Sequence, residues 1–142
     1  MHAAKTKHAA TNCVTHLAPA DRDDKLAAVL DKYLSPIAGP QMIAAATAIK
    51  WASLIALARP HLSERIACAI LKVREATYKT DECRNVAIGH AITSLGAFFE
   101  RIGDRKAVLE FVRAQLHNPR PATRKKAEAF LRKWPASAGA AA

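Results

Sequence analysis

Alanine occupies 32 of the 142 positions of the chain, and this abundance restricts the folds that the chain can adopt. Alanine is the best helix former among the amino acids and is depleted in strands. Only six valines and nine isoleucines, which favour strands, compete with it. Beyond alanine, 40 larger hydrophobic residues are available for a core, which is enough for one small domain. The composition therefore predicts an all-α protein.

Helical periodicity divides the chain into six segments between two tails. Residues 1–20 and 136–142 lack hydrophobic periodicity and are predicted to be disordered, which leaves a helical domain over 21–135. Within this domain the apolar spacing predicts helices at about 22–34, 41–58, 63–77, 81–102, 105–116 and 119–134. Their short connections require successive helices to turn back on one another, so antiparallel hairpins are expected.

The fourth of these segments carries the strongest helical signal. Its apolar residues recur at steps of four, three, four and three: Ile88, Ile92, Leu95, Phe99 and Ile102. Gly89 and Gly96 lie seven residues apart in the same segment. A glycine inside a helix costs about 1 kcal/mol relative to alanine, so we expect another helix to approach closely at these two positions.

Polar residues predict where the later helices begin. Thr80 or Asp81 is expected to start the fourth helix, and Asp104 is the expected N-cap of the fifth. Asn118 followed by Pro119 predicts a cap and a first-turn proline for the sixth helix.

The second half of the chain, residues 82–134, resembles a HEAT repeat of the variety in which a Gly-Asp turn joins the helices. Arg84 and Ala87 repeat as Arg124 and Ala127 at a separation of 40 residues, within the period of about 40 to 47 of such repeats. The stretch from Ala97 to Arg101 is longer than the usual pattern and implies an extended helix. The other residues that carry the resemblance are Ala91, Leu95, Gly96, Ile102, Gly103, Asp104, Ala107, Val108, Phe111, Val112, Leu116, Asn118, Pro119 and Leu131.

The resemblance implies a right-handed α-solenoid of about three antiparallel helix hairpins. It implies no catalytic residue. An irregular six-helix bundle is the alternative arrangement of the same helices.

The net charge of +10 is concentrated at the end of the chain. Residues 101–142 hold ten Lys and Arg against three Asp and Glu. A basic surface attracts nucleic acid, acidic proteins or anionic membranes without sequence specificity, although it can also serve only to keep a protein soluble. Backbone amides at the start of the last helix, together with Arg120 and Arg124, could hold a phosphate. The predicted basic patch consists of Arg105, Lys106, Arg113, Arg120, Arg124, Lys125, Arg132 and Lys133.

The sequence gives little support for a metal-binding, disulfide-rich, catalytic or membrane-spanning protein. The six histidines are scattered, and Cys13, Cys68 and Cys83 form no CxxC pair, so neither a metal site nor a disulfide framework is predicted. No phosphate-binding loop, acid–base pair or nucleophile motif points to catalysis, and no cofactor is expected. No apolar run is long enough to span a bilayer, and the start of the chain does not read as a secretory signal. A cytoplasmic location without membrane binding is the resulting prediction.

Two functions remain as hypotheses. The first is a non-enzymatic helical-repeat binding module or scaffold that engages a protein, a peptide or another acidic partner, as the HEAT resemblance implies. The alternative is a DNA-binding protein similar in plan to the HEAT-like alkylpurine DNA glycosylases, which would contact the phosphate backbone. No acidic residue here matches the catalytic one of those enzymes, so only the binding half of that analogy is carried over.

Overall fold

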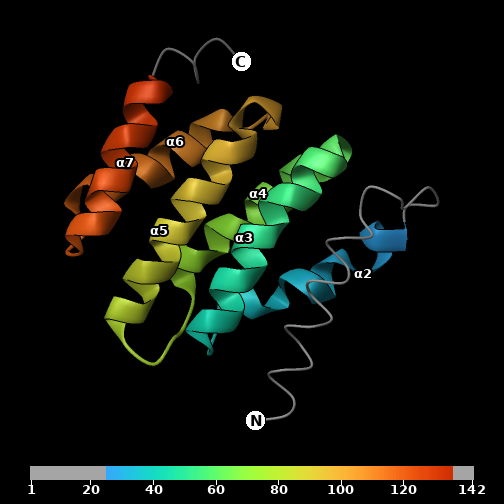
Figure 1. The fold of residues 1–142 in the computed structure, drawn as a ribbon, viewed down its shortest axis with the longest axis horizontal. Coiled ribbons are helices and arrows are strands. Elements are labelled where there is room, and N and C mark those ends of the chain that lie inside the picture. The colour runs from blue at the N-terminus through green and yellow to red at the C-terminus, as the bar shows by residue number, and fades with distance from the viewer. Residues whose placement is uncertain (1–24, 136–142) are drawn as a thin grey trace.

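The computed structural model describes residues 25–135, and in this range every regular element is a helix (Figure 1). The α-helices are α2 (Lys25–Leu34), α3 (Met42–Ala58), α4 (Ser63–Leu71), α5 (Asp81–Phe98), α6 (Arg105–Ala114) and α7 (Pro121–Lys133). Short 3₁₀ segments adjoin them: η2 (Ser35–Ala38), η3 (Pro60–Leu62), η4 (Lys72–Glu75), η5 (Phe99–Arg101) and η6 (Gln115–His117). The prediction of an all-α protein is confirmed for these residues. The predicted tails, 1–20 and 136–142, lie outside them.

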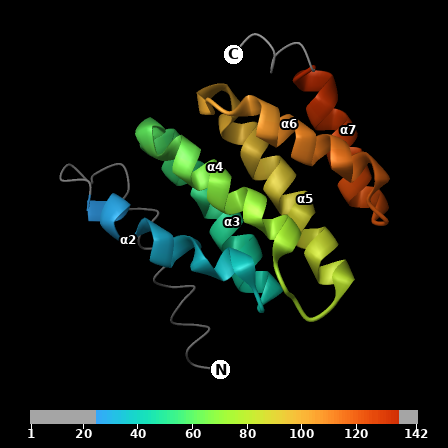
Figure 2. The ribbon, with the colours of Figure 1, turned by 180° about the vertical axis from the view of Figure 1, so that it is seen from behind.

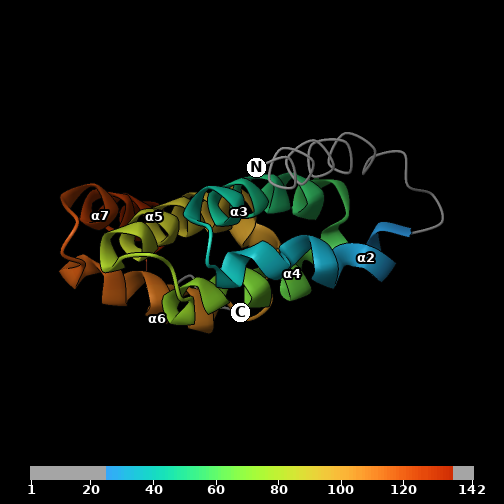
Figure 3. The same cartoon turned by 90° about the horizontal axis from the view of Figure 1, so that it is seen from below.

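The helices form two layers (Figure 3). Helices α3, α5 and α7 lie side by side in the first layer, with α5 packed against both neighbours, and they face the viewer in Figure 1. Helices α2, α4 and α6 form the second layer, which faces the viewer in Figure 2. Successive helices alternate between the layers and run in opposite directions.

The core lies between the layers and around α5. All five periodic residues of the fourth predicted segment are buried: Ile88, Ile92, Leu95, Phe99 and Ile102. Helix α3 contributes small buried residues, among them Ala45, Ala48 and Ala52, which let α5 approach closely. A hydroxyl group then joins the two helices, since the buried Ser94 Oγ donates to the Ile49 carbonyl at 2.9 Å.

The close approach expected at the two glycines is confirmed, and the partner is α7. A Cβ atom added to Gly89 would lie 3.2 Å from Thr123 Oγ1, and one added to Gly96 would lie 3.5 Å from the Phe130 ring. Thr123 Oγ1 also donates to the Asn85 carbonyl at 2.8 Å. Helices α5 and α7 are therefore joined in the same way as α3 and α5: small residues allow a close approach, and a buried hydroxyl forms a hydrogen bond between the helices.

The predicted start of α5 and the predicted N-cap of α6 are confirmed. Thr80 Oγ1 accepts a hydrogen bond from the Cys83 amide at 3.1 Å, and Asp104 Oδ1 accepts one from the Ala107 amide at 3.3 Å.

The beginning of the last helix was predicted wrongly. Helix α7 begins at Pro121, with Arg120 as its N-cap, rather than at Pro119. Asn118 instead organises the preceding turn, because its Oδ1 accepts a hydrogen bond from the Arg120 amide at 2.9 Å. Asn118 Nδ2 donates to the side chains of Asn85 and Gln115, so this residue also ties the turn to α5.

Two helix ends were also predicted too late. Helix α4 ends at Leu71 and α5 at Phe98, and each continues as a short 3₁₀ segment. Val73 and Ile102 keep their predicted places in the core because 3₁₀ or extended backbone carries them there. Within residues 25–135, no helix is both long and apolar enough to cross a lipid bilayer.

Candidate binding surface

Arg105, one of the predicted basic residues, is engaged by other groups of the protein. Its guanidinium folds back over the end of α5 and donates to the carbonyls of Glu100 at 2.7 Å and Ile102 at 3.1 Å. It also lies 5.6 Å from the centroid of the Phe99 ring. Arg105 therefore holds the turn between α5 and α6.

Arg120 and Arg124 at the start of α7 are engaged in the same way. Arg124 Nη1 donates to the carbonyls of Asn118 at 2.7 Å and Pro119 at 3.1 Å. Arg120 forms an ion pair with Glu82 of α5. Both guanidiniums thus bind acceptors of the protein itself, and the phosphate-binding role expected of them finds no support in this geometry.

Lys106 and Arg113 lie on the outward side of α6, in the second layer. Both are exposed, and the exposed Glu110 lies within about one turn of each on the same side of the helix. Charges of opposite sign alternate on this surface, which is typical of a solvated helix face.

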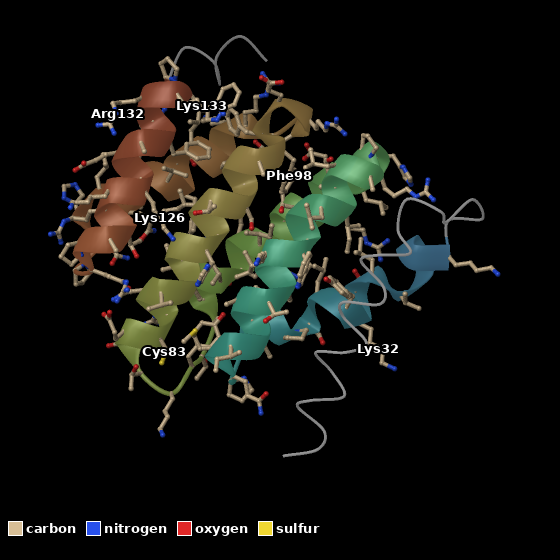
Figure 4. The ribbon with its side chains drawn as sticks, viewed as in Figure 1. Lys32, Cys83, Phe98, Lys126, Arg132 and Lys133 are labelled. Carbon is tan, nitrogen blue, oxygen red and sulfur yellow. The ribbon has the colours of Figure 1, made fainter. Side chains whose placement is uncertain are left out.

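The exposed cations of α7 divide between two sides of the helix. Lys125 and Arg132 are seven residues apart on the side remote from α5, and Figure 4 shows Arg132 pointing away from the other helices. Lys126 and Lys133, also seven residues apart, border the space between α7 and α5 (Figure 4). The predicted patch missed Lys126, although its spacing from Lys133 was visible in the sequence. The eight predicted residues therefore do not form one continuous patch.

Two lysines and a histidine do come together, on the outer surface of the first layer. Lys50 of α3, His90 of α5 and Lys126 of α7 lie near one another there, and we call this surface the α3/α5/α7 face. Burial is the largest cause of the lowered pKa of His90. The positive charges of Lys126, Lys50 and Arg120 lower this pKa further.

Exposed apolar side chains accompany these charges on α3. Ile43, Leu54 and Leu57 are 68%, 42% and 38% exposed. Together with Lys50 they are spaced at seven, four and three residues, so they share one side of the helix. The buried alanines of α3 occupy the other side. The face thus combines positive charge with apolar surface.

Carboxylates are missing from the central part of this face, as far as residues 25–135 are concerned. Helix α3 has none. Asp81 and Glu82 lie in the first turn of α5, where each is paired with an arginine. Glu128 lies about 160° around α7 from Lys126, on the far side of that helix. No carboxylate there neutralises Lys50, Lys126 or Lys133.

A groove of about 380 Å³ lies between α5 and α7 on this face. Apolar and small residues line it, among them Ile92, Gly96, Ala97, Ala129 and Phe130. Lys126 and Lys133 border it from α7, and Trp134 follows at the end of that helix. The Trp134 ring packs 4.9 Å from the buried Phe99 ring, which fixes this part of the wall.

Within the part of the chain that the structure describes, no group of three or more His, Cys, Asp and Glu side chains is placed to hold a metal ion. Comparison with protein-family models, with curated proteins and with solved structures finds no match for this chain.

Proposed function

We propose that this protein is a helical-repeat binding module whose α3/α5/α7 face engages an acidic protein partner. The observation that carries the proposal is the composition of that face: α3 and α7 supply lysines on either side of α5, α3 adds exposed Ile43, Leu54 and Leu57, and the described carboxylates lie elsewhere. Electrostatic complementarity steers an acidic partner to such a surface, and apolar contacts then contribute to affinity.

The HEAT-like solenoid is part of the same proposal. Three hairpins stacked in two layers are what a short solenoid of this type requires, and the order of helices in the layers is compatible with it. In such an array every second helix lies in the same layer, so α3, α5 and α7 together form one extended surface.

Affinity capture tests the proposal with two matched variants. The face variant carries Lys50→Glu and Lys126→Glu, and the control carries Lys106→Glu and Arg113→Glu on the mixed-charge side of α6. Both variants change the net charge equally. We expect wild type and control to retain proteins of low isoelectric point from a nuclease-treated lysate, and the face variant to lose them. Recovery of nucleic acid without any protein partner from an untreated lysate contradicts the proposal.

DNA binding is the second candidate, and the exposed Lys125 and Arg132 on the remote side of α7 favour it. These cations would contact phosphates without reading bases. Titration of a DNA duplex at about 50 mM and about 200 mM salt decides the matter, because several phosphate contacts predict a steep loss of affinity. Absent binding at the lower salt concentration rules this candidate out.

A further inference from the structure

The groove between α5 and α7 has the features of an anchoring site within the larger face. Its volume of about 380 Å³ is at the lower end of the range for ligand pockets, so it suits one apolar side chain and its immediate neighbours. Its lining combines the apolar Ile92 and Phe130 with Gly96, which has no side chain to fill the space.

Lys126 and Lys133 set the electrostatic requirement of the groove. Seven residues on a helix correspond to a rise of about 10.5 Å, so the two lysines leave α7 two turns apart along the groove. Glu128, which lies between them in sequence, is on the far side of α7. Both lysines are exposed and hold their charges on the same side as the apolar lining.

We infer that the α5/α7 groove binds an acidic amphipathic helix of a partner protein. One apolar side chain of that helix enters the groove, and two carboxylates seven residues apart on it pair with Lys126 and Lys133. The inference rests on the proposed function and specifies where on the face the partner is held. The two carboxylates match the two lysines in charge and in spacing, because positions i and i+7 of an α-helix are also about 10.5 Å apart.

The probe for this site is a synthetic helical peptide of about 18 residues, long enough for some helix to form in isolation. It carries Glu at positions i and i+7 and Leu at position i+4. Two companion peptides replace both Glu by Gln, or the Leu by Ala. Trp134 reports binding by its fluorescence in a Trp51→Phe background, because the chain has two tryptophans.

We expect the Glu/Leu peptide to change the emission of Trp134 saturably. Each companion peptide should bind about tenfold more weakly, since two exposed ion pairs or one buried apolar side chain contribute modestly. Ala97→Phe, at an exposed position of the groove lining, should weaken the Leu peptide and leave the binding of the Ala peptide nearly unchanged.

Charge reversals on the two sides of α7 supply the matched control. Lys126→Glu with Lys133→Glu should remove binding of the Glu/Leu peptide. Lys125→Glu with Arg132→Glu makes the same change of charge at the same spacing on the remote side, and should alter affinity by less than about threefold. Equal weakening by both pairs would mean that net charge alone attracts the peptide, and the inference would be overturned.

The outcomes also separate this inference from the proposed function. If the peptide fails to bind, or binds equally well after Lys126→Glu with Lys133→Glu, the groove is not the site. The broader proposal then still stands or falls with the retention of acidic proteins by the α3/α5/α7 face in affinity capture.

Discussion

The basic side chains of α6 and α7 differ in whether the protein itself engages them. The guanidiniums of Arg105 and Arg124 donate to main-chain carbonyls at turns, a task suited to a planar group with several donors. Lys126 and Lys133 are exposed residues of α7, and the Lys133 ammonium lies 5.3 Å from the centroid of the Trp134 ring. A count of basic residues treats all of these as equivalent, and for this reason the predicted patch mixed structural arginines with cations that a partner could reach.

His90 makes the stability of the fold depend on pH. Its pKa is lowered in the folded protein, mainly by burial, whereas histidine in an unfolded chain takes up a proton near pH 6.5. Acidification below about pH 6.5 therefore favours the unfolded chain, until the folded His90 is protonated as well. Urea unfolding of wild type and His90→Gln between about pH 8 and about pH 5 should show wild type losing more stability. An equal loss in both proteins would contradict this account.

The two glycines of α5 should respond differently to alanine. Gly96→Ala places its Cβ at ordinary contact distance from the Phe130 ring, so the better helix propensity of alanine should raise the free energy of unfolding by about 0.5 to 1 kcal/mol. At Gly89 the added Cβ would lie 3.2 Å from Thr123 Oγ1, whose position is fixed by its bond to the Asn85 carbonyl. Gly89→Ala should therefore raise the free energy of unfolding by less than Gly96→Ala does, or should lower it. Chemical denaturation measures both, and a larger gain at Gly89 than at Gly96 would refute the packing described.

At the scale of elements, α5 is joined to each neighbour by one buried hydroxyl. Ser94→Ala removes the donor from α5 to the Ile49 carbonyl of α3, and Thr123→Val removes the donor from α7 to the Asn85 carbonyl of α5. Each should lower the free energy of unfolding by about 1 kcal/mol or somewhat more, because a buried carbonyl loses a partner. Thr93 serves as the control, since this exposed residue donates its hydroxyl to the Gly89 carbonyl within α5 itself rather than to another helix. Thr93→Val should change stability by less than about 0.5 kcal/mol. Similar losses for all three would show that the hydroxyls do not join the helices.

The helices themselves were largely predictable from the sequence, because apolar spacing and caps are local signals. The ends of α4 and α5 were not, since Val73 and Ile102 continue the apolar spacing after the α-helix has stopped. Burial requires only that a side chain reach the core, and a 3₁₀ turn satisfies that as well as an α-helix does. Pro119 and Pro121 both fit a first helical turn, and the choice between them depends on hydrogen bonds that Asn118 makes to α5 and to its own turn.

The candidate site was less predictable than the helices. Helix α3 is apolar on nearly all sides in sequence, so nothing local shows that its alanines pack inward while Ile43, Leu54 and Leu57 remain exposed. The sequence alone therefore did not show which residues share a surface with Lys50. Only the packing of α3, α5 and α7 in one layer brings Lys50, His90 and Lys126 together, and that is a long-range property.

Across the whole molecule, the two layers present different surfaces. The second layer mixes charges: Asp31 of α2 and Arg65 of α4 form an ion pair at 2.9 Å, and Glu110 lies between Lys106 and Arg113 on α6. The first layer is cationic and partly apolar on its outer surface. Under the proposed function, the first layer would be the side that binds a partner and the second layer the side that contacts solvent.

The most direct test of this division is a nuclear magnetic resonance titration of the nitrogen-15-labelled protein with the Glu/Leu peptide. The account predicts that amide shifts concentrate in the first layer, at residues that line the α5/α7 groove such as Gly96, Lys126 and Lys133, while Lys106 and Arg113 of α6 stay unchanged. Shifts centred on α6, or spread evenly over every basic residue, would contradict it.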